Sequence, residues 1–400
     1  MEESGLRDIR VLDLCRTAPG AFCTMILGDL GAEVYKVETP YSGDTPIFGS
    51  GVSPLPGKDG KERGAYSSLN RNKKSIALDL KSEEGRQIFY SLARKSDVIV
   101  EGFRPGVTGR LKVDYETIKG INPAIICCSM SGYGQDGPYR DLPGHDINYI
   151  SIAGALGMIG SSGQAPAIPM NFIADYAGGS LFAVIGVLAA IVARQNTGAG
   201  QYVDIAMTDG AISLLSRLAS DYFKDGLIPK RGEQELNGGA PYYNVYETRD
   251  GKYVSVGCLE PVFWENLCRA FNLEELIPFQ HAEGTKREEI FARLKEAFLT
   301  RTRDEWFEIL KEKNVCVAPV YELDETFSDP QALHRQMVIG VTHPELGEVK
   351  QVGSPIKFSA GSPEVRSTAP FLGEHTDSIL LELGYKARDI KSLREAKIIQ

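Results

Sequence analysis

Two ionisable residues, His145 and Asp175, bracket a segment that is rich in small residues and contains only one further charge, that of Asp146. His145 follows a glycine, and Asp175 stands just before a long apolar run. A histidine and a carboxylate that face each other across a small pocket can take a proton from one face of a carbon atom and return one to the other face. The pair therefore predicts proton-transfer chemistry at a carbon centre.

Each candidate also has a purely structural interpretation. A single histidine is more often a structural or surface residue than a catalytic one. A carboxylate at a helix start is stabilised by the helix dipole, which would also keep it ionised as a base or nucleophile. Glu260 lies between a predicted strand and a predicted helix, where an acidic residue is common in any protein. The chain contains no serine-hydrolase elbow, no P-loop and no metal-ligand spacing, so no metal site is expected.

Alternating apolar strands and amphipathic helices in the first half of the chain must position these residues. The pattern predicts an α/β fold with a Rossmann-like, doubly wound parallel sheet, because buried parallel strands are apolar throughout. The predicted strands are 9–14, 33–37, 75–80, 97–100, 124–130 and 201–207, and the predicted helices are 21–30, 82–95, 115–121, 175–195 and 209–223.

A shift to polar, glycine-rich composition near residue 225 predicts a second domain. A hairpin with its turn at Asp250-Gly251 and three helices, at 261–271, 286–299 and 303–313, predict a smaller α+β domain. We expect a large domain at 1–224, the small domain at 225–325 and a return segment at 326–400 with a hairpin at 336–358 and a helix at 376–383. Tyr41–Gly64 is predicted to be a long surface loop.

The stretch Gly132–Gly137 matches G-x-G-x-x-G after an apolar strand, but prolines follow where a dinucleotide site needs a helix. We therefore interpret it as a glycine-rich turn at the carboxyl end of a strand, where ligands of open α/β sheets bind. Basic residues at predicted strand ends would suit phosphate binding, with solvated surface charge as the alternative. They are 70–74 (Asn-Arg-Asn-Lys-Lys), Lys81, Arg104 and Arg110.

Composition excludes several classes of protein. The formal net charge of -9 argues against nucleic-acid and membrane-surface binding, both of which need a basic face. Seven cysteines without a C-x-x-C pair indicate reduced thiols. The apolar run 181–193 is too short to span a bilayer and is expected to be a core helix. The acidic N-terminal residues lack a signal region, so a cytoplasmic protein is expected.

Several motifs together resemble the family III CoA-transferases, and the similarity covers nearly the whole chain. Three segments, 144–149, 238–243 and 257–261, resemble the alpha-methylacyl-CoA racemases of that family more than its transferases. The transferases share the aspartate that matches Asp175 as their nucleophile, but they typically lack the histidine that matches His145. The motifs are 18–22 (Ala-Pro-Gly-Ala-Phe), 28–34, 36–38, 70–75, 78–81, 103–106, 131–135 and 197–201.

This resemblance implies an interlocked homodimer, a CoA-binding large domain, a small domain over the site, and no metal or redox cofactor, with coenzyme A entering as part of the substrate. It also implies which positions line the CoA-thioester site. These are Leu78, Asp79, Leu80, Lys81, Gly102, Phe103, Arg104, Arg110, Gly144, Asp146, Ile147, Asn148 and Tyr149.

The resulting hypothesis is racemisation at C2 of a 2-methyl-branched acyl-CoA through an enolate. His145, oriented by Glu260, would serve one stereoisomer and Asp175 the other. The alternative is a CoA-transferase that forms an acyl intermediate on Asp175, and a third possibility is a CoA-ester-binding protein without turnover. The acyl chain, whether fatty, steroid-like or aryl, stays open.

Overall fold

The computed structural model describes residues 5–41, 67–361 and 363–400. Its contacts divide the chain into two compact units. The first contains Met1–Ala153, Met170–Leu214 and Pro330–Gln400, and the second contains Gly154–Pro169 and Leu215–Asp329. The second unit thus includes the predicted small domain and, in addition, residues 154–169, 215–224 and 326–329, which were predicted to belong to the large domain and the return segment. The predicted loop Tyr41–Gly64 lies, apart from Tyr41, outside the described residues.

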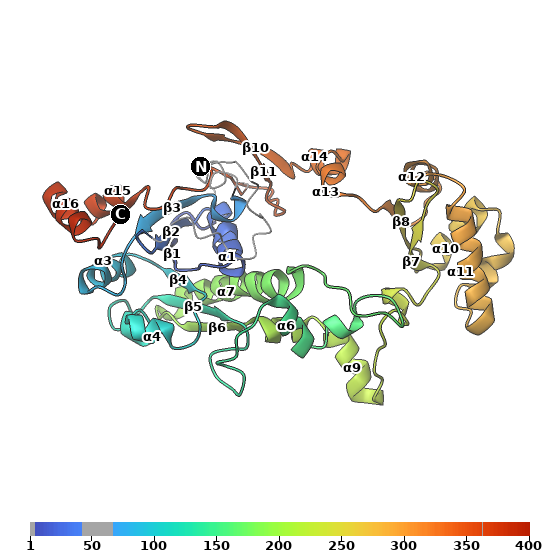
Figure 1. Cartoon of the computed structure of the whole chain (residues 1–400), viewed down its shortest axis with the longest axis horizontal. Coiled ribbons are helices and arrows are strands. Elements are labelled where there is room, and N and C mark those ends of the chain that lie inside the picture. Colours follow the sequence, from blue (N-terminus) through green and yellow to red (C-terminus); the bar gives the residue numbers. More distant parts are fainter. Residues whose placement is uncertain (1–4, 42–66, 362) are drawn as a thin grey trace. The chain divides into compact units, whose positions relative to one another are not determined.

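A six-stranded parallel sheet forms the centre of the first unit (Figure 1). Its order is β3-β2-β1-β4-β5-β6, which is the Rossmann order, and it confirms the predicted fold class. Val11 of β1 pairs with Val34 of β2 on one side and with Val98 of β4 on the other. The strands are β1 (Arg10–Asp13), β2 (Glu33–Glu38), β3 (Lys73–Ala77), β4 (Val98–Glu101), β5 (Ile126–Ser131) and β6 (Tyr202–Ala206).

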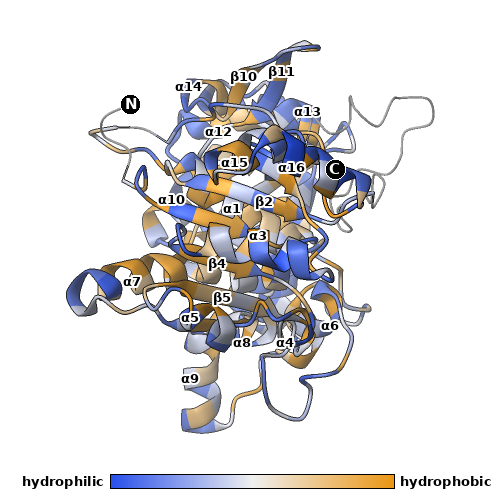
Figure 2. Cartoon of the chain, turned by 90° about the vertical axis from the view of Figure 1, so that its left-hand side faces the viewer, coloured by the Kyte–Doolittle hydropathy of each residue, from blue (hydrophilic) through white to orange (hydrophobic). Residues whose placement is uncertain are grey.

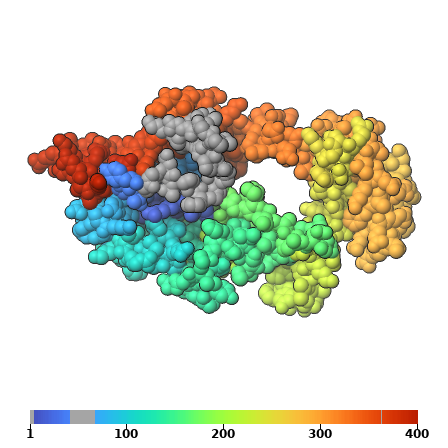
Figure 3. Space-filling model, viewed as in Figure 1, coloured from blue at the N-terminus to red at the C-terminus, as the bar shows by residue number. Residues whose placement is uncertain are grey.

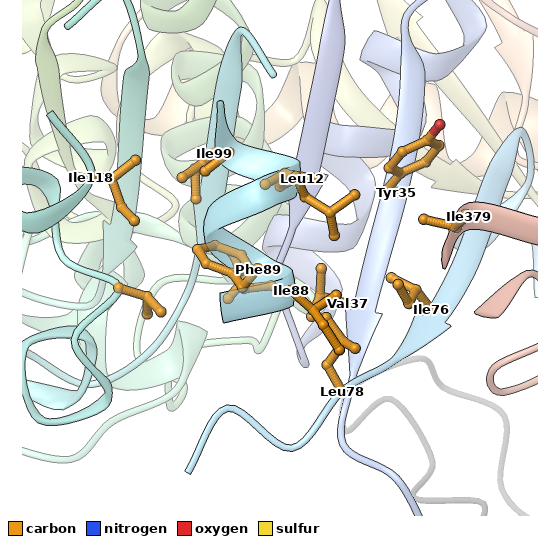
Figure 4. Close-up of a cluster of buried hydrophobic side chains, with 14 of the residues drawn as sticks. Leu12, Tyr35, Val37, Ile76, Leu78, Ile88, Phe89, Ile99, Ile118 and Ile379 are labelled. Atoms are coloured by element: carbon orange, nitrogen blue, oxygen red, sulfur yellow. The ribbon is translucent and has the colours of Figure 1, made fainter. Parts of the chain in front are cut away.

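One face of this sheet packs against α3 (Glu83–Ala93) and two C-terminal helices, α15 (Thr376–Glu382) and α16 (Ala387–Glu395). Ile88 and Phe89 of α3 point at the strand side chains, as Figure 4 shows. Ser82 caps α3 as predicted, since its Oγ accepts a hydrogen bond from the Gly85 amide at 3.0 Å. Phe89 is fully buried, so its truncation to alanine would destabilise the protein by about 3–5 kcal/mol.

The other face carries α1 (Ala18–Asp29) and one long helix that begins as a π-helix. The π-helical part, η3, spans Phe172–Leu181, and α7 continues it as Phe182–Thr197. The predicted helix at 175–195 is therefore confirmed, but it begins three residues earlier. The predicted helix at 209–223 is wrong as a single element, because it breaks into α8 (Met207–Ser213) and α9 (Ser216–Asp225).

Two glycines let α8 approach η3 closely. A Cβ atom at Gly210 would lie only 2.0 Å from the carbonyl oxygen of Gly178. Ser180 adds a polar contact between η3 and the start of α1, because its Oγ donates a hydrogen bond to the Pro19 carbonyl at 2.7 Å. The start of η3 is thus fixed between α1 and α8, and this is the part of the helix that carries Asp175.

The helix from Phe172 to Thr197 is long and apolar enough to cross a membrane by length and composition alone, so the prediction that this apolar stretch is too short to span a bilayer is wrong. Figure 2 shows the apolar colour along most of α7. Its inner residues, such as Val187 and Ala190, are buried, whereas Ile185 and Val192 on the outside are each 58% exposed. The helix therefore contributes one face to the core, as expected for a core helix, and presents a second apolar face outward.

The basic segment 70–74 does not form a phosphate site. The Lys73 ammonium lies 2.9 Å from an Asp13 carboxylate oxygen, with both side chains fully buried, and Arg71 forms a buried pair with Asp29. Lys74 lies 2.8 Å from Glu33. Arg71 and Lys73 are thus neutralised inside the fold, and the partly exposed Lys74 is paired with Glu33, so the phosphate interpretation of this segment is wrong.

The second unit has its own core, and the orange residues of α10–α12 form a dense body in Figure 3. Phe298 stacks on Tyr246 and meets Phe271 and Trp306 edge-on, at ring-centroid distances of 4.8, 4.9 and 5.9 Å. The predicted hairpin and helices are confirmed as β7 (Tyr243–Glu247), β8 (Tyr253–Gly257), α10 (Pro261–Ala270), α11 (Gly284–Phe298) and α12 (Arg303–Lys311), with β9 (Val317–Pro319) completing an antiparallel sheet.

The return segment contributes the predicted hairpin, as β10 (Val338–His343) and β11 (Gly347–Val352), and the predicted helix α15. Helix α16 was not predicted. The other elements are η1 (Ser68–Asn70), α4 (Val107–Leu111), α5 (Tyr115–Lys119), α6 (Asp146–Ile152), η2 (Leu156–Met158), η4 (Glu235–Asn237), η5 (Glu274–Phe279), α13 (Leu323–Thr326) and α14 (Pro330–His334). All seven cysteines are free thiols, as predicted.

Candidate active site

A cavity of about 950 Å³ lies in the first unit, at the carboxyl ends of the sheet strands. Its lining comes from the segments that follow β1, β4, β5 and β6. The strand order reverses between β1 and β4, and ligands of open α/β sheets bind beside that point. The cavity is large enough for a substrate the size of a small cofactor, and the topology alone would direct attention to it.

The glycines of the G-x-G-x-x-G stretch make room for a tyrosine rather than for a phosphate. A Cβ atom at Gly132 would lie 2.3 Å from the Tyr149 ring, and one at Gly144 would lie 2.6 Å from it. The Tyr149 hydroxyl donates to the Gly144 carbonyl. No helix begins within 132–137, which confirms the predicted turn. Tyr149 thereby fixes the segment that leads into α6.

His145 precedes α6 in an extended backbone conformation, with φ -132° and ψ 176°. Its amide donates to the side-chain oxygen of Asn148 at 3.1 Å, which stabilises the helix start. The imidazole is exposed and lines the cavity, together with Ile147 and Asn148. The residue therefore has no core-packing role.

Asp175 lines the same cavity from the first turn of η3. Burial raises the pKa of its carboxyl group to about 6, and the charge of Asp146 acts in the same direction. The Asn171 side chain, which donates to Asp175 Oδ2 at 3.1 Å, and the nearby His145 oppose that pKa shift. A carboxyl group with this pKa can both accept and donate a proton near neutral pH.

Asp146, which was expected to line the substrate site, is 4% exposed and directs its carboxylate at the main chain. Its Oδ2 accepts hydrogen bonds from the amides of Ala174 and Asp175 at 2.7 and 2.8 Å. These are early amides of η3, which lack acceptors inside the helix. The side chain of Asp146 thus caps the helix that carries Asp175.

Three arginines, Arg104, Arg110 and Arg140, line the cavity of this acidic protein. Arg104 follows β4 in a turn that the buried Glu101 holds through a 2.7 Å bond to the Phe103 amide. A Cβ atom built on Gly106 would lie 3.5 Å from an Arg140 nitrogen and 3.6 Å from an Arg110 nitrogen, so the two guanidinium groups converge there. Such a pair suits a phosphate.

Most predicted site residues come together at this cavity: Gly102, Phe103, Arg104, Arg110, Gly144, His145, Asp146, Ile147, Asn148, Tyr149 and Asp175. The segment Leu78–Lys81 does not line it. Leu78 is buried and bridges to Ile399, and the Asp79 amide donates to Ile398. Glu260 precedes α10 in the second unit and has an exposed side chain that makes no capping hydrogen bond, and its action on His145 stays a prediction.

Several cavity residues were not singled out from the sequence as ligand contacts. Thr17 and Met207 follow β1 and β6, so the rule that ligands bind at strand ends could have found them. Asn171 and Arg140 carry no comparable local signal, because each reaches the site from a loop. Met170 also lines the cavity, with its backbone in the left-handed region at φ 58°.

Comparison with known proteins now decides the family. The model of the CoA-transferase family III matches residues 6–376. The chain belongs to this family. Within family III it is 34% identical to the human alpha-methylacyl-CoA racemase over 396 residues, covering 99% of this chain and 97% of that protein. It is also 33% identical to the human succinyl-CoA:glutarate CoA-transferase, covering 98% of this chain and 90% of that protein.

A solved structure supports the fold assignment. A CAIB/BAIF family protein from Brucella suis superposes with a TM-score of 0.82 at 30% identity, covering 96% of this chain and all of that chain. Because racemases and transferases match at nearly equal identity, overall similarity identifies a CoA-ester enzyme family but does not select the reaction. The residues that line the cavity must therefore distinguish the racemase reaction from the transferase reaction.

Proposed function

We propose that the protein racemises C2 of 2-methyl-branched acyl-CoA thioesters, with His145 and Asp175 as its two acid–base groups. The observation that carries the proposal is that both side chains line one cavity and that the pKa of Asp175 is raised to about 6. A general acid–base group is most effective when its pKa lies near the working pH. At pH 7 about one Asp175 in ten would hold its proton.

The reaction would proceed in two proton transfers. One group removes the proton at C2, and the electron pair of the C–H bond moves into the thioester, giving an enolate with its charge on oxygen. The protonated group on the other side then donates to the opposite face of C2, and the enolate collapses to the thioester. The two groups exchange protonation states over one turnover, so the reverse reaction uses them in exchanged roles.

The enolate oxygen needs hydrogen-bond donors, and α6 offers them. The first amides of a helix have no acceptors within the helix, and α6 begins at Asp146 on the cavity wall. We propose that the amides of Asp146 and Ile147 stabilise the enolate oxygen, since such donors typically contribute about 3–4 kcal/mol each to the transition state. Arg104, Arg110 and Arg140 would hold the phosphates of the CoA moiety.

The alternative function is a CoA-transferase in which Asp175 attacks the thioester and becomes acylated. It is favoured by the family III transferases that match this chain at similar identity. It needs an ionised Asp175, which a pKa of about 6 also allows at pH 7. It assigns no proton transfer to His145, although His145 lines the cavity. The position of the histidine therefore supports racemisation over transfer.

A screen in heavy water tests the proposal. Single enantiomers of several 2-methylacyl-CoAs would be incubated with the protein, and NMR would follow deuterium uptake at C2 and loss of optical purity. We expect uptake with racemisation, and its absence for all substrates would refute the proposal. Acyl exchange between CoA donors that needs Asp175 but not His145 would establish the transferase instead. Tight binding without either reaction would indicate a CoA-ester-binding protein.

We also propose that the protein works as an interlocked homodimer with Glu260 oriented towards a His145 imidazole. Exposed apolar side chains on both units support this proposal, because soluble monomers rarely expose so many. Ile185 and Val192 of α7 are 58% exposed, and Phe223 and Ile228 of the second unit are 81% and 75% exposed. Sedimentation at micromolar concentration would test it, and an active monomer would contradict it.

A further inference from the structure

The carboxylate of Asp146 is bound on one oxygen only. Oδ2 accepts the two amides of Ala174 and Asp175, whereas Oδ1 is inaccessible to solvent and has no hydrogen-bond partner among the described residues. An ionised oxygen that is buried without a donor is costly, and such groups need an explanation. The burial of Asp146 raises its own pKa, which shows that the fold opposes its charge.

Capping alone does not require this charge. The side-chain oxygen of asparagine accepts hydrogen bonds from helix amides about as well as that of aspartate. An asparagine at position 146 would therefore keep an acceptor for the amides of Ala174 and Asp175. What only aspartate supplies at this place is a negative charge beside a second carboxyl group.

We propose that Asp146 is a positioning residue for Asp175: its carboxylate anchors the main chain of residue 175 and holds a second negative charge next to the acid–base carboxyl group. The inference rests on the proposed role of Asp175 in proton transfer. Like charges disfavour each other's ionised form, so the charge of Asp146 makes Asp175 a stronger base. The same charge also offsets the opposite influence of His145.

The surroundings of Asp175 leave few other groups that could set its proton affinity. From α6 and the residue before it, Asp175 faces His145, Asp146 and Tyr149. From its own helix and the residue before it, Asp175 faces Asn171 and Tyr176. Tyrosine hydroxyls are neutral at working pH, and burial raises the pKa of Tyr149 to about 12. Asp146 is therefore the one neighbouring anion within this group of described residues.

The test is a titration of the free protein, which needs no substrate. Protein labelled with ¹³C at aspartate Cγ would be titrated by NMR, with Asp175 assigned from Asp175→Asn. In Asp146→Asn we expect the Asp175 midpoint to fall by about one pH unit, because an adjacent charge typically moves a pKa by that much or more. Asp204→Asn is the matched control: Asp204 also has a raised pKa and accepts a main-chain amide, that of Gln135, yet lies outside the cavity lining.

A midpoint that stays in place in folded Asp146→Asn would overturn the proposal and leave Asp146 a structural cap. If that variant does not fold, the titration of the wild-type protein still tests the proposal. The proposal requires the Asp146 midpoint to lie at lower pH than the Asp175 midpoint, and the reverse order would overturn it. The titration is independent of the reaction. A shifted midpoint without deuterium exchange in any substrate would uphold the role of Asp146 while refuting racemisation.

Discussion

The hydrogen bond from Asn171 to Asp175 leads to a prediction that is opposite in sign to the one for Asp146. Asn171 Nδ2 donates to Asp175 Oδ2 at 3.1 Å and thereby lowers the pKa of the carboxyl group. Asn171→Leu keeps a side chain of similar size but removes the donor. Because the bond stabilises only the ionised form, its loss raises the pKa of Asp175 above its value of about 6.

The size of this shift follows from the strength of the bond. A hydrogen bond to a charged group contributes about 1.5–3 kcal/mol, and Asp175 is half-buried, so the lower end applies. At 1.36 kcal/mol per pKa unit, the pKa rises by about one unit, to about 7. The ionised fraction at pH 6 then falls from about one half to about one tenth, a loss of roughly fivefold.

The assay is the pH dependence of kcat/KM for each enantiomer, which reports ionisations of the free enzyme. For the enantiomer whose proton Asp175 removes, the acid limb of the profile should move up by about one pH unit in Asn171→Leu. Asn266→Ala serves as control, since the Asn266 side chain donates to the Asn314 carbonyl in the second unit and does not line the cavity. An acid limb that stays in place, or moves to lower pH, would show that this bond does not control the ionisation of Asp175.

Three further predictions follow from the site and its support. Arg110→Ala and Arg140→Ala should each raise KM for CoA esters about tenfold with kcat nearly unchanged, and a selective loss of kcat in steady-state kinetics would contradict the phosphate assignment. Gly132→Ala should destabilise the protein by about 1–3 kcal/mol in urea unfolding, because its Cβ would strike the Tyr149 ring. Asp175→Asn should stabilise the fold by about 2 kcal/mol at pH 8 and not at pH 4. Burial raises the pKa of Asp175, so its ionised form opposes folding only above about pH 4–6, and asparagine cannot ionise. Equal changes in unfolding free energy at both pH values would refute this account.

The sequence pattern predicted the sheet well because its signals are local. The strands β1, β4 and β5 are short, largely apolar segments bounded by turns, and Ser82 marks the start of α3 as its N-cap. His145 and Asp175 were predicted from residue type and spacing, and the strand-end rule explains why they lie near the sheet edge. Helix α16 was missed, although Ile390 and Leu393 are spaced for one apolar helix face.

Other features depend on contacts that no local pattern encodes. The sequence does not show whether a phosphate or a buried aspartate neutralises the charges of Arg71 and Lys73, and in the structure buried aspartates do so. The π-helical start of η3 forms where Asp146, 28 and 29 positions earlier in the chain, caps its amides. The guanidinium group of Arg140 lies beside Gly106, which is distant in the sequence. These residues required the tertiary structure.

The backbone at position 145 has a consequence for how this scaffold changes chemistry. An extended conformation with φ -132° admits any L-amino acid, and the exposed side chain at this place packs into no core. The neighbouring Asp146, in contrast, is fixed by its bonds to η3. Evolution can therefore exchange the residue at 145 without refolding the protein, while the aspartate on η3 stays in place. One unconstrained position beside a fixed one would let related enzymes diverge in reaction while they keep the same fold.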